Sequence, residues 1–272
     1  MHSKRDAAAC RKEGIGMART VLSVRNLKKL YKNNRGVYSI TMNVHEGEVV
    51  GLLGPNGSGK STAMKAIMGM CSADEGEIRI FDHDIDTEFE AATENVGCLI
   101  EAPALYDNMT AYQNLAMAAR FYPELSRGDA EARINEVLRL VSLEKYAGDK
   151  AGRFSLGMRQ RLGIALALLS KPRLVILDEP TNGLDIEGVV HIRETVKEMA
   201  EKEGVTFLIA GHIAAELEKM CTKAAVISEG RLLAFEDMDK ILENNPSLED
   251  YFLSTVRSGG MGGNYGENIG KL

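Results

Sequence analysis

The sequence contains no tryptophan, only four cysteines and no long apolar run. Cys10, Cys71, Cys98 and Cys221 have neither metal-site nor redox-pair spacing, so we expect buried free thiols in a reducing cytosol. The longest apolar stretches, such as residues 162–169, fall short of the about 18 consecutive apolar residues that a membrane helix needs. We therefore expect a chain that does not itself cross a bilayer.

An excess of positive charge is absent as well, because the formal net charge is −6. This balance argues against a general nucleic-acid role, and we expect no specific nucleic-acid partner. The 272 residues, 44% of them hydrophobic, suffice for one large domain or a domain with a subdomain. Residues 1–20 have too short an apolar patch for a signal peptide, so we interpret them as a disordered extension, with Met17 as an alternative start.

Apolar patterns predict an α/β protein in which strands alternate with helices. Such alternation indicates a parallel sheet covered on both faces. Residues of about 101–170 have helical character and are interpreted as an insertion into this core. After the core, residues 236–257 are expected to form a helical segment, and residues 258–272 a flexible glycine-rich tail. The expected strands lie at residues 21–24, 37–44, 49–53, 78–81, 174–177 and 207–210.

Two helices have apolar stripes that we assign to the core. In the insertion, Ser126 and Asp129 resemble a capping box before the stripe Ile134, Val137, Leu138 and Val141. Later in the chain, an amphipathic helix is predicted from Val189, Ile192, Val196 and Met199.

A glycine-rich segment follows the predicted strand at residues 49–53 and precedes a helical pattern. Glycines allow successive backbone N–H groups to face one anion, and the N-terminus of the following helix adds positive potential. In such a loop Lys60 would reach the β- and γ-phosphates, and the Ser61 hydroxyl would bind Mg²⁺. A plain turn is the alternative, but the strand–loop–helix context favours a nucleotide site. The loop comprises Gly54, Pro55, Asn56, Gly57, Ser58, Gly59, Lys60, Ser61 and Thr62.

Polar residues follow two further apolar strands. Asp178 and Glu179 come after residues 174–177, and His212 follows residues 207–210. Ligands of open α/β sheets bind at the carboxyl ends of strands, so these residues should meet at one nucleotide. Asp178 would hold Mg²⁺ and Glu179 would deprotonate the attacking water, whereas His212 alone would more often be structural.

The motifs together resemble those of ATP-binding-cassette (ABC) ATPases over residues 21–235. Residues 154–161 resemble the family signature motif, residues 182–185 its D-loop, His212 its switch histidine and Tyr31 its adenine-stacking aromatic residue. The resemblance implies a P-loop ABC ATPase with a RecA-like mixed or parallel sheet core, an N-terminal antiparallel β subdomain and an inserted helical subdomain. It also implies ATP and Mg²⁺ as cofactors.

Two cassettes, identical or different, pack head to tail in this family, and each signature helix caps the partner's ATP. Ser155 is a plausible N-cap of such a helix, and with Gly157 and Asp185 it joins the implied nucleotide contacts. Leu156 and Met158 depart from the usual glycine and glutamine of the motif.

The chain also departs from the family at the position of one glutamine. In the family this glutamine follows the strand that precedes the helical insertion. Glu101 occupies this position, and residues 100–103 read Ile-Glu-Ala-Pro. Together with residues 247–253, this segment resembles the bacterial branch of bacitracin- and lantibiotic-resistance exporters. The resemblance implies that Glu101 is a metal ligand beside Ser61 and Asp178; the alternative is a solvated surface acid.

We therefore expect an ATP-hydrolysing subunit of a bacterial ABC exporter, bound to membrane permease subunits at the cytoplasmic face of the membrane. The surface around residues 101–112 would contact the permease, and peptide antibiotic, drug and lipid all remain open as cargo. One alternative is a soluble ABC ATPase of nucleic acid or the ribosome, although the chain has neither a second cassette nor a long coiled-coil insertion. Another is a regulator that binds ATP without turnover, against which Lys60, Asp178, Glu179 and His212 argue.

Overall fold

The computed structural model describes residues 19–32, 34–122 and 126–259. Within these ranges the chain forms a ten-stranded sheet with the order β5-β4-β1-β2-β10-β9-β3-β8-β7-β6. The strands are β1 (Thr20–Leu30), β2 (Gly36–His45), β3 (Val49–Leu53), β4 (Glu75–Ile80), β5 (His83–Asp84), β6 (Val96–Leu99), β7 (Leu174–Asp178), β8 (Thr206–Gly211), β9 (Lys223–Ser228) and β10 (Arg231–Asp237). The helices are α1 (Lys60–Ile67), α2 (Phe89–Thr93), α3 (Ala111–Ala119), α4 (Arg127–Leu140), α5 (Leu156–Leu168), α6 (Ile186–Glu203), α7 (Ala214–Met220), α8 (Met238–Asn244) and α9 (Leu248–Gly259), with short 3-10 helices at Glu144–Tyr146 and Ala151–Arg153.

The sheet has a parallel part and an antiparallel part. Strands β9, β3, β8, β7 and β6 pair in parallel, as the alternation of strands and helices predicted. Strands β2, β1, β4 and β5 pair antiparallel. Strand β10 joins the two parts, since it pairs antiparallel with β9 and parallel with β2. The predicted combination of a parallel core with an N-terminal antiparallel portion is confirmed.

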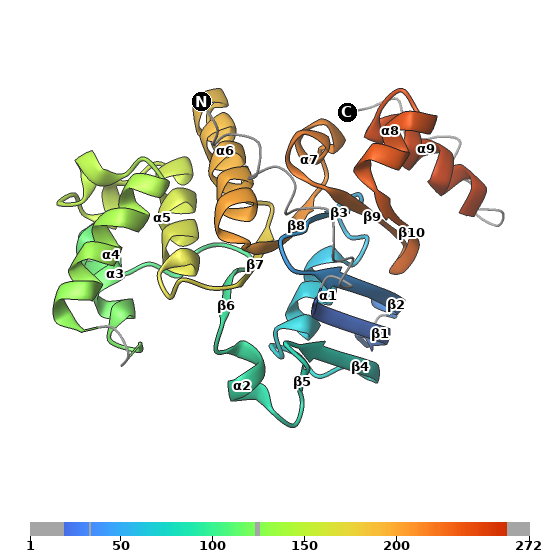
Figure 1. Ribbon diagram of the computed structural model, residues 1–272, viewed down its shortest axis with the longest axis horizontal. Coiled ribbons are helices and arrows are strands. Elements are labelled where there is room, and N and C mark those ends of the chain that lie inside the picture. Colours follow the sequence, from blue (N-terminus) through green and yellow to red (C-terminus); the bar gives the residue numbers. More distant parts are fainter. Residues whose placement is uncertain (1–18, 33, 123–125, 260–272) are drawn as a thin grey trace, which may run out of the picture.

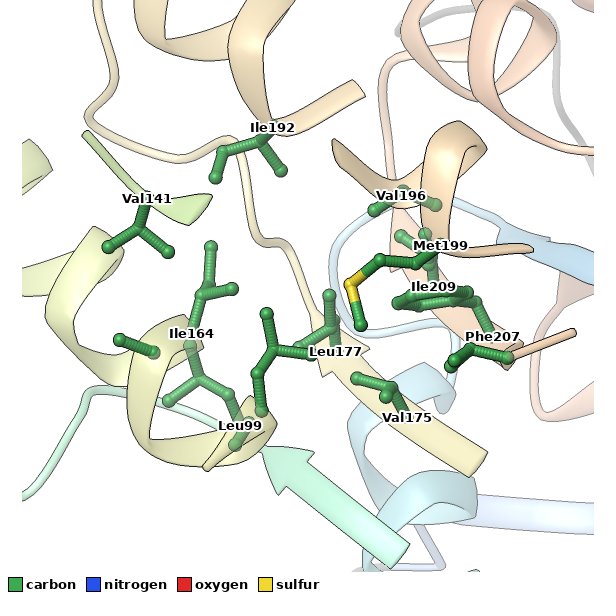
Figure 2. Close-up of a cluster of buried hydrophobic side chains, with 14 of the residues drawn as sticks. Leu99, Val141, Ile164, Val175, Leu177, Ile192, Val196, Met199, Phe207 and Ile209 are labelled. Atoms are coloured by element: carbon green, nitrogen blue, oxygen red, sulfur yellow. The ribbon is translucent and has the colours of Figure 1, made fainter. Parts of the chain in front are cut away.

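The parallel strands are buried on both faces. All five residues of β3 and all five of β7 are buried, which explains the apolar sequences of β3 and of β7 up to Leu177. Along β7 the side chains alternate between two cores: Val175 and Leu177 belong to one, Leu174 and Ile176 to the other. Figure 2 shows the first core, where Met199 of α6 lies beside side chains of β7 and β8.

The inserted helices α3, α4 and α5 lie together at one side of the sheet (green to yellow in Figure 1). Ser126 caps α4 by accepting a hydrogen bond from the Asp129 amide, so the predicted helix start is confirmed. Its apolar stripe is buried, as are Ile192, Val196 and Met199 on α6. Val189, the first residue of the second predicted stripe, is only partly buried, and the other residues of both stripes belong to the core.

Several boundaries differ from the sequence interpretation. Strand β4 begins at Glu75, earlier than the expected start at residue 78, and ends at Ile80. Residues 101–110 form bends and turns, and the first helix of the insertion begins at Ala111. Helix α9 includes Ser258 and Gly259, which were expected in the tail. Residues 260–272 of that tail and residues 1–18 of the expected extension lie outside the described residues.

Candidate functional site

The glycine-rich loop between β3 and α1 has a backbone that requires glycine. Gly57 and Gly59 have φ angles of +80° and +106°, in the left-handed region that other residues rarely adopt. A Cβ on Gly54 would lie 2.3 Å from the Ile227 carbonyl oxygen. The Ser58 hydroxyl is buried and has no hydrogen-bond partner among the described residues. A narrow glycine loop with a free buried hydroxyl suits a phosphate group.

Lys60 begins α1 and is almost fully buried, with 5% of its surface exposed. Its Nζ donates to the carbonyl oxygens of Gly54, at 2.8 Å, and Pro55, at 3.1 Å. Burial lowers the pKa of the ammonium, while the carboxylates of Glu179 and Asp178 act to raise it. The Glu179 Oε1 atom lies 3.9 Å from Nζ. A buried cation therefore lies at the base of the loop, within reach of an anion.

Asp178 is the last residue of β7 and is 8% exposed. The Ser61 hydroxyl hydrogen-bonds to its carboxylate, yet Oδ1 has no partner in the described part of the chain. Burial raises the pKa of Asp178, against the opposing effect of Ser61. A buried carboxylate oxygen beside a hydroxyl provides the oxygen ligands that Mg²⁺ prefers, so the residues fit this metal.

Glu179 follows Asp178 with a φ of 49°, an unusual value for a residue with a side chain. Its Oε1 atom lies 3.1 Å from His212 Nδ1, and Asn182 donates a hydrogen bond to Oε2. Gln160 of α5 donates to the Glu179 carbonyl oxygen at 3.3 Å. The backbone and side chain of this acid are thus both held in place.

The contacts of Gln160 and Asn182 with Glu179 were not anticipated from the sequence. Gln160 is buried on a helix that is otherwise largely apolar, and a buried polar side chain must find a partner. That position was the one signal available, but it did not identify the partner, which lies 19 residues further along the chain.

Glu101 follows β6 with a φ of 66°, and its side chain is 63% exposed. Its carboxylate forms an ion pair with Lys65 of α1, a partner not expected from the sequence. The residue nevertheless faces the same groove as the site acids. This groove is lined by Ser61, Glu101, Ala102, Leu156, Gln160, Asp178, Glu179 and Asn182.

Tyr31 lies just after β1 and is 44% exposed. It begins the turn into β2, where its amide donates to the Arg35 carbonyl oxygen at 2.8 Å. This turn contacts the glycine-rich loop, because a Cβ on Gly59 would lie 3.0 Å from the Gly36 carbonyl oxygen. An exposed aromatic ring is therefore carried by a segment that touches the phosphate loop.

Ser155, Gly157 and Asp185 lie outside the groove that contains Asp178 and Glu179. Ser155 caps α5 by accepting from the Met158 amide, as predicted. Asp185 caps α6 by accepting from the Gly188 amide at 2.9 Å. Gly157 packs closely on the D-loop, since a Cβ there would lie 2.6 Å from the Gly183 carbonyl oxygen. Ser155 and Asp185 are exposed, Gly157 is buried, and the neighbouring Leu156 lines the edge of the groove.

The residues of the three predicted strand ends meet because β3, β8 and β7 are neighbours. In the parallel register Leu53 pairs with Gly211, and Asp178 pairs with Ala210. A phosphate loop, a buried lysine and two adjacent acids at the carboxyl ends of parallel strands define the class of P-loop nucleoside triphosphatases.

Comparison with known sequences specifies the family within this class. Residues 37–182 match the profile of the family described as ABC transporter. The ABC transporter ATP-binding protein YdbJ of Bacillus subtilis (strain 168), itself uncharacterized, is 42% identical over 218 residues, which are 80% of this chain and 70% of YdbJ. The bacitracin transport ATP-binding protein BcrA of Bacillus licheniformis is 35% identical over 86% of this chain and 76% of its own length. The lantibiotic transport ATP-binding protein SrtF of Streptococcus pyogenes is 37% identical over 87% of this chain and 97% of its own.

Solved structures of ABC transporter subunits resemble the fold of this chain. An ATP-binding subunit of an ABC transporter superposes with a TM-score of 0.79 at 31% identity, covering 87% of this chain and 100% of that one. A dimeric ATP-binding cassette in a post-hydrolysis state with ADP and Pi gives a TM-score of 0.73 at 26% identity, covering 80% of this chain and 98% of that one. The chain belongs to the ABC transporter family and is an ATP-binding, ATP-hydrolysing subunit, which confirms the resemblance drawn from its motifs.

The membrane-spanning part of such a transporter was not expected in this chain. Across the described ranges, no helix combines the length and hydropathy required to cross a bilayer.

Proposed function

We propose that the chain hydrolyses Mg²⁺-bound ATP to drive export through separate permease subunits, with a peptide antibiotic or a drug as cargo. The observation that carries the catalytic part is the convergence of Lys60, Ser61, Asp178, Glu179 and His212 at three neighbouring strand ends. The cargo class rests on relatives whose names include bacitracin and lantibiotic transport.

Each residue of the proposed site has a role that follows from its chemistry. The backbone of residues 54–62 and the Lys60 ammonium would bind the phosphates, and Tyr31 would stack on adenine. Ser61, Asp178 and Glu101 would supply oxygen ligands to Mg²⁺. When bound, the metal would neutralise phosphate charge and align the groups for transfer.

Glu179 is the proposed general base. Its Oε1 atom lies near the nitrogen atoms of His212 and Lys60, and Asn182 donates a hydrogen bond to Oε2, so the carboxylate is held from both oxygens. It would accept the proton of the attacking water, and His212 would keep the carboxylate in this position. Glu179 also has a left-handed backbone, a conformation that clusters at active sites.

We further propose that two cassettes, identical or different, form the working unit. Ser155, Gly157 and Asp185 would contact the ATP of the partner cassette, since each caps or adjoins a helix N-terminus outside its own groove. The dimeric neighbour supports this arrangement. The surface of residues 101–112 would contact the permease at the cytoplasmic face of the membrane. The irregular backbone of residues 101–110 and the exposed Tyr106 support a contact surface there.

Glu179→Gln tests the catalytic proposal. We expect the variant to bind ATP but to lose hydrolysis by on the order of 10²-fold, because an amide cannot accept the proton. In the presence of ATP, the variant should then accumulate as a stable dimer, which size-exclusion chromatography would detect. Glu201→Gln, which changes an exposed acid of α6, is the matched control and should keep wild-type turnover. Near-normal hydrolysis by Glu179→Gln would remove this residue from the role of base.

A further inference from the structure

The Glu101 carboxylate has a cationic partner on α1. The Lys65 ammonium and the Glu101 carboxylate form a direct ion pair, with 30% and 63% of their side-chain surfaces exposed. The two residues lie 36 positions apart, so the tertiary structure alone brings them together. Because the pair is partly exposed, it is weak enough to break and reform.

Lys65 is also close to the groups proposed to bind the metal. Ser61 and Lys65 are four residues apart on α1, and such residues lie on the same face with Cβ atoms about 5–6 Å apart. Ser61 hydrogen-bonds to Asp178, and Ser61, Asp178 and Glu101 all line one groove. A carboxylate bound to Lys65 is therefore about one helical turn from the Ser61 hydroxyl.

Charge balance makes two partners of the Glu101 carboxylate alternatives: the Lys65 ammonium and a metal ion. With Asp178 and Glu179, Glu101 is the third acid of the groove, and its negative charge acts on Asp178. Lys65 compensates this third charge in the ion pair. A divalent cation at Ser61 and Asp178 would attract the same carboxylate and compensate it instead.

We propose that Lys65 and the metal ion compete for Glu101, so that Lys65 determines the Mg²⁺ concentration at which the site binds Mg²⁺-ATP. This inference rests on the proposed metal site. Lys65 is a positioning residue in this scheme: it contacts neither nucleotide nor metal and acts only through Glu101.

The test is a double-mutant cycle on nucleotide binding, so that it does not depend on turnover. Binding of a fluorescent, non-hydrolysable ATP analogue is followed during a Mg²⁺ titration for the wild type, Lys65→Met, Glu101→Gln and the double variant. We expect Lys65→Met to lower the Mg²⁺ midpoint by about two- to fivefold, the range of an exposed ion pair. In the Glu101→Gln background the same substitution should change nothing, and Lys65→Arg should resemble the wild type.

Lys202→Met is the matched control, because it removes an exposed ion pair with Glu198 on α6. It should leave the Mg²⁺ midpoint unchanged. An equal effect of Lys65→Met in both backgrounds, no effect in either, or a higher midpoint would overturn the competition. A wild type whose nucleotide binding ignores Mg²⁺ would overturn the proposed metal site itself, and the two failures are thereby distinguishable.

Discussion

Single residues of the site carry charge in places where burial opposes it. Burial raises the pKa of Asp178 and lowers the pKa of Lys60, so both charged forms are disfavoured by the surroundings. Each group is compensated in part by the other and by neighbouring side chains. Such a site lowers the stability of the free protein and gains stability when ligands complete its contacts.

Asp178→Asn should therefore stabilise the nucleotide-free protein while removing its response to metal. An amide of the same shape carries no charge that must be desolvated. We expect the Tm without ligands to rise by about 2–4 °C, which corresponds to about 1 kcal/mol in a protein of this size. Mg²⁺ added with ATP should stabilise the wild type more than the variant, as measured by calorimetry. A lower Tm for the variant without ligands would show that the charge is fully compensated.

The difference in stability between Asp178→Asn and the wild type should depend on pH. An acid whose folded-state pKa is raised costs no stability below its unfolded pKa, about 3.9, because both states are then protonated. The cost grows as pH rises toward the folded-state pKa of Asp178 and is complete above it. The stability difference between Asp178→Asn and the wild type should accordingly increase with pH and then level off. A difference that shrinks with rising pH would contradict the assignment.

At the scale of elements, the turn between β9 and β10 supports the phosphate loop. The Gly230 amide donates to the Ser58 carbonyl oxygen at 2.9 Å, and the Tyr38 amide donates to the Gly230 carbonyl oxygen at 2.8 Å. Gly230 has a φ of +74°, and a Cβ on it would lie 2.4 Å from the Gly36 carbonyl oxygen. The turns β1–β2 and β9–β10 therefore meet at the loop.

Gly230→Ala should displace the phosphate loop and weaken ATP binding several-fold. A residue forced into a left-handed conformation costs about 1–3 kcal/mol, and here the Cβ also collides with backbone. Gly204→Ala separates the cost of the left-handed conformation from the effect of the collision. Gly204 has a φ of +69° at the end of α6, but a Cβ there meets nothing within 4 Å. Both variants should lose stability in thermal melts, whereas only Gly230→Ala should raise the Kd for ATP in calorimetric titration. Equal ATP affinities would show that the turn does not support the loop.

At the scale of the whole molecule, the chain has two surfaces that we propose bind phosphate, and they lie on different elements. The first is the phosphate loop with Lys60 and the adjacent groove with Asp178, and the second is the N-terminus of α5 with Ser155. In the proposed head-to-tail dimer, each surface would complete the site of the other subunit.

Mixing two inactive variants tests this arrangement. Ser155→Arg should block the partner's γ-phosphate, and Lys60→Ala should abolish ATP binding because the phosphates lose a buried counter-ion. In a mixed dimer both defects fall in one composite site and the other site is intact. ATPase activity at equal concentrations should recover to about a quarter of the wild type, since half of the random dimers are mixed and each has one good site. Each variant alone is the control, and no recovery at any ratio would contradict independent two-chain sites.

The sequence by itself determined the local part of this protein. The glycine-rich loop, the capped helices at Ser126 and Ser155 and the apolar strands before Asp178 and His212 are encoded by residues close together in the chain. Such features depend on backbone freedom, helix capping and periodicity, and all three can be read along the sequence. The order of the motifs was sufficient to indicate the family.

Tertiary structure decided how distant segments combine. No local signal identifies the partner in the ion pair of Glu101 with Lys65, the hydrogen bond from Gln160 to Glu179 or the pairing of β10 with β2. Each joins groups that are far apart in the chain and meet only when helices pack on the sheet and strands choose their neighbours. Packing and strand pairing depend on the whole set of buried surfaces rather than on any one window of residues, so the pattern along the chain located the site acids but not the partners that hold them.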